Sequence, residues 1–359
     1  MAADNLNLRL DLHRAFWDRR PLPRPLASFR LGDYFFSRQF AAARPLLEEY
    51  KKITPDMLDV DAFLADYERM FHEVAEIGQD GFWTGEPFTG IPWVEAMLGC
   101  EVYGSAASFI TRPWAKSVGD LEKIALDPEN PWLLKYLEFC RKLNALSQGR
   151  FPIGHPIMRG LSDTLGAALG QTELVFAVME EPERMQNLFY RVASFYREII
   201  GQQTAVTDDF YGGRALGFYH VWAPGSAIWF QEDLSALLSP RLYRDLLLAP
   251  DRSILAGYQY TAVHLHPVSF FILDDLLRVD ELRAIQVNKD VGGPSVREML
   301  PQLKKIAAVK SLIIWGDLDE ADIDCIAAEL PGQAVFLNIV APDLGRAKAL
   351  MEHLRAKEG

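Results

Sequence analysis

The second half of the chain repeats a pattern that few folds can accommodate, in which short apolar runs alternate with amphipathic segments. After residue 210, five such runs follow one another, at 215–222, 260–267, 282–290, 309–317 and 334–341. Segments with helical spacing of their apolar residues, such as SFFILDDLL and SVREMLPQLKKIA, lie between them. Apolar runs separated by helices are typical of strands in a parallel sheet that is covered on both faces.

The first half of the chain fits the same architecture. PLASFRLGD (25–33) predicts a first strand, and helical segments follow it, among them one that starts at Asn130-Pro131 and ends at Gly149. The sequence shows neither an internal repeat nor a Gly/Ser linker that would divide it. We therefore predict a single domain over 1–359, an α/β fold in the form of a (β/α)₈ TIM barrel with an N-terminal helical extension.

Composition argues against several classes of function. The formal net charge of -12 opposes a nucleic-acid partner, because such binding depends on Lys and Arg side chains that meet phosphates. No apolar stretch reaches the roughly 18 residues of a membrane helix, and MAADNLNLRLDL lacks the apolar core of a signal peptide. We expect a cytoplasmic protein without a membrane partner, and its oligomeric state, a dimer included, stays open.

Polar residues recur where the predicted strands end, which is where a (β/α)₈ barrel places its chemistry. In TAVHLHPVS (261–269), His264 and His266 stand two residues apart, so that on a strand both rings lie on one face. Two neutral imidazoles suit Zn²⁺, with Asp233 or Asp290 as the third ligand and Cys325, in a predicted helix, as a weaker candidate. The alternatives are that the pair contacts a substrate without metal or serves only the structure.

Further residues are candidates for the same cleft. The sequence offers His155, His220, Asp233 and Asp290 as catalytic groups, and Trp222, Arg159, Asn288, Phe88 and Asn338 as substrate-binding groups. Each has a structural alternative: a packed loop histidine, a core aromatic residue, a helix cap at Asp233, or a surface ion pair of Arg159 with Asp163. The acidic stretch GDLDEADIDC lacks the Gly and Glu that an EF-hand loop requires, so we predict a strand end that runs into a capped helix.

Several stretches, in this order along the chain, carry a resemblance to a known family. They are FTGIPWVEAMLGCEVYG (88–104), PIMRGLSDTLGAALG (156–170), EDLSALLSPRLYRDLLLAP (232–250), HLHP, and GDLDEADIDCIAAELPG (316–332). Together they resemble the uroporphyrinogen decarboxylase superfamily, which includes zinc- and corrinoid-linked methyltransferases. The resemblance spans most of the chain and implies a (β/α)₈ barrel with a deep cleft at its carboxyl face.

The resemblance also bears on activity. In the true decarboxylases, an aspartate that grips the pyrrole nitrogens stands at the position of Gly90, so decarboxylation of uroporphyrinogen is disfavoured. The methyltransferases carry a His-x-Cys pair at the position of His264 and His266 and a second cysteine near the last strand, which here reads VFLNIVAPD. The resemblance implies zinc at the two histidines and methyl transfer to or from a thiol or a corrinoid on a separate protein. A decarboxylase of a tetrapyrrole or smaller acid, and a non-catalytic tetrapyrrole- or corrinoid-binding protein, are the alternatives.

Overall fold

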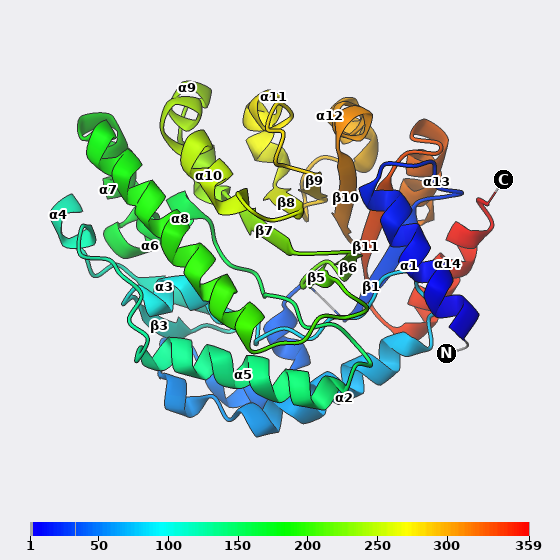
Figure 1. The fold of residues 1–359 in the computed structure, drawn as a ribbon, viewed down its shortest axis with the longest axis horizontal. Helices are drawn as coiled ribbons and strands as arrows, with labels where there is room; N and C mark the ends of the chain where they lie inside the picture. The colour runs from blue at the N-terminus through cyan, green and yellow to red at the C-terminus, as the bar shows by residue number, and fades with distance from the viewer. Residues whose placement is uncertain (1–2, 33, 359) are drawn as a thin grey trace.

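One parallel sheet organises the molecule (Figure 1). The computed structural model describes residues 3–32 and 34–358, and its six-stranded sheet has the order β1-β11-β10-β9-β8-β7. The strands are β1 (Leu26–Leu31), β7 (Ala227–Gln231), β8 (Tyr260–Leu265), β9 (Ala284–Asn288), β10 (Ser311–Gly316) and β11 (Val335–Ala341). Every neighbouring pair is parallel. The strands predicted at 260–267, 282–290, 309–317 and 334–341 are therefore confirmed.

Helices surround this sheet, and both ends of the chain lie on the same side of the molecule (Figure 1). The helices are α1 (Ala3–Trp17), α2 (Val60–Ala75), α3 (Trp93–Met97), α4 (Val118–Leu121), α5 (Pro131–Ser147), α6 (Leu161–Leu169), α7 (Gln171–Glu180), α8 (Pro182–Ala205), α9 (Pro240–Leu242), α10 (Leu248–Leu255), α11 (Leu273–Leu276), α12 (Val296–Val309), α13 (Glu320–Glu329) and α14 (Leu344–Arg355). Helix α5 begins as predicted, because the Asn130 side chain accepts hydrogen bonds from the backbone of Trp132 and Leu133.

The strand predicted over 215–222 is wrong, because this run forms an antiparallel hairpin of β5 (Arg214–Leu216) and β6 (Val221–Ala223). Its turn is closed by a hydrogen bond from Tyr219 N to Leu216 O of 3.1 Å. Gly217 starts the turn where a Cβ atom would lie only 2.3 Å from the carbonyl oxygen of His155. The close approach of that neighbouring segment admits only glycine, and the chain turns back there. A second antiparallel sheet joins β2 (Lys52–Ile53), β3 (Glu101–Gly104) and β4 (Phe109–Arg112).

Two irregular segments continue the parallel sheet beyond β1. The backbone N–H groups of Asp80 and Gly81 donate to Ala27 O over 2.9 and 3.0 Å, and Gly85 forms a parallel bridge with Ile153. These contacts are isolated and do not build a regular ladder. Of the predicted fold, the structure confirms an α/β architecture with a parallel sheet of six strands, and two further segments lie along the edge of this sheet.

Side chains on the two faces of the sheet belong to different apolar clusters. On β8, Val263 and Leu265 pack with the surrounding helices, as predicted. Ala262 lies in a second cluster, which also contains Trp17 of α1. The indole nitrogen of Trp17 donates to Trp222 O over 2.8 Å. The predicted N-terminal helical extension is thus α1, packed against the hairpin and against the face of the sheet that carries Ala262.

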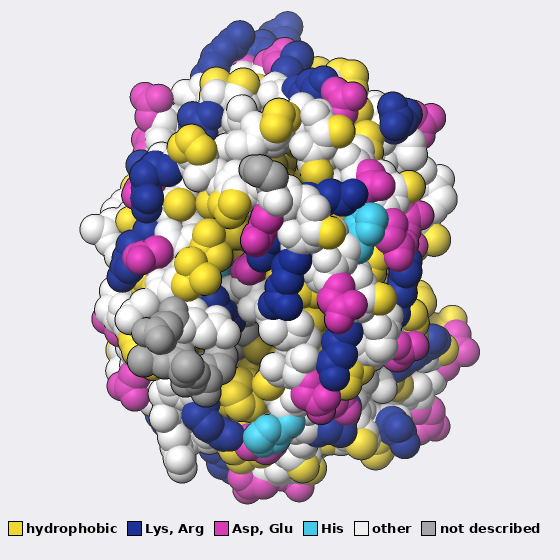
Figure 2. Space-filling model, turned by 90° about the vertical axis from the view of Figure 1, so that its right-hand side faces the viewer, with side chains coloured by type: hydrophobic (Ala, Val, Ile, Leu, Met, Phe, Trp, Pro, Cys, Tyr) yellow, Lys and Arg dark blue, Asp and Glu magenta, His cyan; other side chains and the backbone are white. Residues whose placement is uncertain are grey.

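The surface carries charges of both signs. On the face shown in Figure 2, Lys and Arg side chains are interspersed with Asp and Glu side chains, and hydrophobic side chains border a hollow between them. Among the helices of residues 3–32 and 34–358, none combines the length and the apolar character that crossing a membrane would need.

Two buried histidines make stability depend on pH. Burial lowers the pKa of His13 and of His155 to about 4. Protonation then favours the unfolded chain, so this contribution is complete above pH 6.5 and is lost as the pH falls toward 4. We expect each histidine to cost about 2 kcal/mol of unfolding free energy at pH 5 relative to pH 7.5.

Urea unfolding of the wild type and of His13→Phe at both pH values measures this contribution. Because buried carboxyl groups titrate as well, the relevant quantity is the difference between the two proteins. The variant is expected to lose less stability on acidification than the wild type. An identical pH dependence in both proteins would contradict the assignment.

Candidate metal centre

The cluster of interest is built at the carboxyl ends of three adjacent parallel strands. Asp233 follows β7, His264 and His266 lie at the end of β8, and Asp290 follows β9. The register pairs Gln231 with His264 and His264 with Gln286. Neighbouring strands therefore bring side chains that are far apart in sequence into one row.

Three of these side chains converge on one point. The Nε2 atoms of His264 and His266 lie 3.6 and 3.9 Å from Oδ1 of Asp233. One potential ligand atom of each residue lies within 4.8 Å of the others. The two imidazole rings are 4.7 Å apart, centroid to centroid, and nearly perpendicular. Asp233 and Asp290 are the alternative third ligands that the sequence predicts. The geometry groups Asp233 with the two histidines.

The second nitrogen of each ring is held by an oxygen acceptor. Nδ1 of His264 is hydrogen-bonded to Oε1 of Gln286, whose own amide nitrogen donates to Asn288 Oδ1 over 3.0 Å. Nδ1 of His266 lies 2.7 Å from Oδ1 of Asp290. Acceptors at Nδ1 place the proton there and leave the Nε2 lone pair free. Both lone pairs are thus available where the ring faces Asp233, an arrangement typical of histidine metal ligands.

The third group of the cluster is also oriented by neighbours. The side-chain amide of Gln231 donates to Oδ2 of Asp233 over 2.7 Å, which leaves Oδ1 toward the histidines. Asp163 accepts hydrogen bonds of 3.0 Å from the backbone of Asp233 and Leu234. Hydrogen bonds therefore hold both the backbone and the side-chain carboxylate of Asp233 in place.

The two histidines differ in how readily they would bind a cation. Burial lowers the pKa of His264, which keeps this ring neutral near pH 7. Burial also opposes the charged form of His266, but the hydrogen bond to Asp290 and the charge of Asp233 outweigh it and raise the pKa. Burial and the charge of Asp233 raise the pKa of Asp163 to about 7. A bound cation would have to displace any proton on His266, so affinity should rise with pH.

A cavity of about 380 Å³ opens beside Asp233 and is lined by Arg159 and Asp163. Nη1 of Arg159 lies 3.2 Å from Oε1 of Glu95, a residue buried completely in α3. The predicted alternative of a surface pair between Arg159 and Asp163 is replaced by this contact with a buried acid. Glu95, Gln231 and Gln286 were not found from the sequence, although Gln286 stands two residues before Asn288 on the same strand face.

Two predicted histidines lie apart from the cluster. Nε2 of His155 accepts a hydrogen bond of 3.2 Å from Trp229 N, which links its segment to β7. Its Nδ1 lies 3.0 Å from Pro156 O. His220 sits in the β5–β6 turn and is buried. The structure does not bring either ring to Asp233 and the β8 histidines.

The remaining predicted residues are distributed between the site and the core. Asn288 belongs to the network behind His264. Trp222 is buried and donates to Phe210 O over 2.7 Å, and Phe88 packs among core aromatic rings. Asn338 donates to Ser28 Oγ over 2.6 Å. Cys325 is buried in α13, as expected from its helical pattern.

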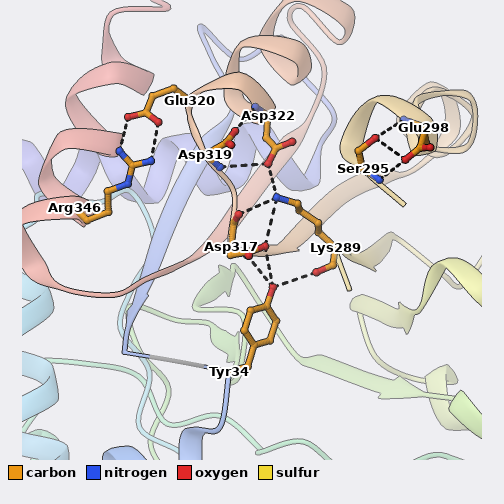
Figure 3. A network of polar contacts seen from close by, with 9 residues as sticks. All are labelled: Tyr34, Lys289, Ser295, Glu298, Asp317, Asp319, Glu320, Asp322 and Arg346. Atoms are coloured by element: carbon orange, nitrogen blue, oxygen red, sulfur yellow. Dashed lines mark hydrogen bonds and ion pairs between the residues drawn. The ribbon is translucent and has the colours of Figure 1, made fainter. Parts of the chain in front are cut away.

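A polar network beside the cluster ties the segment after β1 to the ends of β9 and β10 (Figure 3). Lys289 Nζ donates to Asp322 and to Asp317 O over 2.7 and 2.9 Å, while the Tyr34 hydroxyl donates to Lys289 O over 3.2 Å. Asp319 and Asp322 form the capping box of α13. The acidic stretch is therefore a strand end followed by a capped helix, as predicted.

Removing the acceptor behind His266 should weaken metal binding. We expect Asp290→Asn to lower Zn²⁺ affinity about 10- to 100-fold, because the outer carboxylate fixes the ring and its tautomer. Competition with a chromophoric chelator measures the affinity. Asp274→Asn, at an exposed ion pair with Lys305, is the matched control. Equal affinities for the two variants would show that Asp290 does not support the site.

Comparison with known proteins shows which fold the chain shares but does not assign it to a family. No protein-family model matches the chain, and no curated protein matches it significantly. Among solved structures, a methyltransferase from Methanosarcina mazei has a TM-score of 0.64 at 13% identity, over 98% of this chain and 99% of its own. A B12-independent methionine synthase from Shewanella sp. W3-18-1, in complex with selenomethionine, has a TM-score of 0.41 at 11% identity, over 62% and 65% of the two chains. The chain thus shares the overall fold of the Methanosarcina mazei methyltransferase along nearly its full length.

Proposed function

We propose that the chain is a metal-dependent methyltransferase with a distorted (β/α)₈ barrel of the uroporphyrinogen decarboxylase type. The observation that carries the proposal is the convergence of Nε2 of His264, Nε2 of His266 and Oδ1 of Asp233, with both Nδ1 atoms held by oxygen acceptors. The fold shared with a methyltransferase supports the same reaction class. In this interpretation, residues 80–85 and 152–155 occupy the positions of two barrel strands, although neither segment is a regular strand.

The donor set fits zinc. Two imidazole nitrogens and a carboxylate oxygen are ligands that Zn²⁺ commonly takes, and catalytic zinc sites often use three protein ligands. His264, His266 and Asp233 would hold the ion, while Gln286, Asp290 and Gln231 keep them in place. Zinc bound at such a site supplies Lewis acidity, which lowers the pKa of a coordinated thiol and makes it nucleophilic at neutral pH.

The protein's own groups would bind and orient the reactants. Arg159 lines the cavity beside Asp233 and offers N–H donors to a polar or anionic substrate group. Asp163 can hold a proton near neutral pH beside the cluster. We propose that the methyl group moves to or from a thiol or a corrinoid, and that the corrinoid is carried by a separate protein.

The residue at position 90 does not support uroporphyrinogen decarboxylation. A Cβ atom on Gly90 would lie 2.5 Å from Ser37 Oγ and 2.7 Å from a ring carbon of Phe88. An aspartate, which the resemblance places here in the decarboxylases, would not fit without rearrangement. Packing around position 90 therefore disfavours the aspartate that uroporphyrinogen decarboxylation would require, while decarboxylation of a smaller acid does not depend on it.

The test is a methyl-transfer assay with zinc-loaded protein, methylcobalamin and 2-mercaptoethanol. Loss of the methylcobalamin absorbance, with methylated thiol as the product, is expected for the wild type. The double variant His264→Ala/His266→Ala should fall to the rate without protein. His353→Ala, which removes a histidine paired with Asp324 far along the chain, should keep the wild-type rate. Turnover that persists in the double variant would refute the proposal.

A further inference from the structure

A separate cavity lies between β1, α2 and the start of α14. Its volume is about 470 Å³, within the roughly 300–1,000 Å³ typical of small-molecule pockets. Its walls are mainly apolar and include Phe29, Met70, Val74, Trp83 and Leu344. It shares no lining residue with Asp233 and the β8 histidines among the described residues.

One polar side chain in the wall of this cavity lacks a partner. His220 is 2% exposed, and its Nδ1 is enclosed without a hydrogen-bond partner in the described parts of the chain. Burial and the nearby charge of Arg30 lower its pKa well below the usual value, so the ring is neutral. Its backbone is left-handed, with φ of 60°, and its carbonyl accepts from Phe82 N over 3.0 Å. The turn thus holds in place an imidazole whose buried Nδ1 is unsatisfied, which native proteins rarely do without a reason.

The charged residues around the cavity already have partners. Arg30 lies 3.2 Å from Glu86, and both side chains are largely buried. Arg69 lies 3.0 Å from Glu73, and Asp343 caps α14 by accepting from Arg346 N over 2.8 Å. An ionic ligand would lose its hydration in this cavity without gaining an unpaired charge as a partner. An uncharged ligand would not incur this cost.

We propose that this cavity binds a small, uncharged, ring-shaped molecule whose single hydrogen-bonding group meets the imidazole of His220. The side chains of Phe29, Met70 and Trp83 would cover the ring of the ligand. Nδ1 is enclosed as the ring now lies, so the imidazole would have to turn toward the cavity for a donor on the ligand to reach it. That hydrogen bond would satisfy an atom whose isolation is costly. This inference is independent of the proposed methyl transfer, because neither site needs the residues of the other.

Indole and benzofuran test the proposal, since they match in shape and only indole has an N–H donor. Ligand-observed NMR titration of the full-length protein gives both affinities. We expect saturable binding, with indole about fivefold tighter because it gains one hydrogen bond. Absence of saturable indole binding would overturn the proposal.

Two variants and one control variant locate the binding. Met70→Trp should fill the cavity and abolish binding of both probes, while Met179→Trp, at a position on α7 that is 63% exposed, should leave it unchanged. His220→Phe should remove the preference for indole over benzofuran. Binding that survives Met70→Trp would place the probes elsewhere and refute the site. A preference that survives His220→Phe would refute the role of the imidazole. If His220→Phe fails to fold, the Met70→Trp comparison still decides whether this cavity binds the probes.

Discussion

Replacing either His264 or His266 with alanine is expected to lower the affinity for Zn²⁺ by more than about 100-fold. Each change removes one of three converging donors, which should exceed the roughly 10- to 100-fold cost of losing an outer partner. His264 is the more buried of the two rings, with 8% of its side chain exposed against 30% for His266. Chelator competition at pH 7.5 measures both affinities.

His353→Ala serves as the matched control, because His353 pairs with Asp324 on the surface of α13 and α14. Its affinity for zinc should equal that of the wild type. Circular dichroism would establish that the variants stay folded. If the alanine variants at β8 bind zinc as tightly as the control, the metal is held elsewhere.

Replacing Asp80 with alanine is expected to lower the free energy of unfolding by about 3–5 kcal/mol. Asp80 and Arg24 form a two-pronged ion pair over 2.7 and 3.1 Å, with 7% and 5% of their side chains exposed. Asp80 Oδ2 also accepts from Ala27 N over 2.9 Å. The variant would remove a buried carboxylate from the guanidinium of Arg24, which would keep its contacts with Glu358 and Pro25 O. It would also leave the strand N–H of Ala27 without its acceptor, at the edge where residues 80–85 join β1.

Urea unfolding measures this loss, and Asp11→Ala is the control. Asp11 pairs with Arg14 over 2.8 Å, but 68% of its side chain is exposed, so its removal should cost less than about 1 kcal/mol. Similar losses for the two variants would mean that the Arg24–Asp80 pair does not hold the sheet edge together.

The regular part of the fold could be predicted because its signal is local. Runs such as 260–267 and 334–341 are rich in apolar residues, and β8 and β11, which follow them closely, are buried on both faces. The run at 215–222 is also rich in apolar residues, but it forms a hairpin whose turn begins at Gly217, where the carbonyl oxygen of His155 leaves no room for a Cβ atom. Residues 80–85 and 152–155 have too few sheet contacts to show a strand pattern at all. The conformation of these segments therefore depends on tertiary packing and not on a local sequence pattern.

The site was partly predictable for a similar reason. The i, i+2 spacing of His264 and His266 on a strand puts both rings on one face, and the position of Asp233 after β7 made it a candidate ligand. What the sequence could not supply was the sheet register that sets Gln286 behind His264. His155 and His220 matched the same strand-end rule but lie elsewhere, because their segments are not regular strands.

His264, His266 and Asp233 together are expected to bind a single zinc ion. The most direct measurement is a crystal structure of protein purified without a histidine tag and soaked with zinc, with anomalous data at the zinc edge. One strong anomalous peak is expected within coordination distance of both Nε2 atoms and the Asp233 carboxylate. A map in which zinc-loaded crystals show no peak at this position, or show it only at other residues, would contradict the claim.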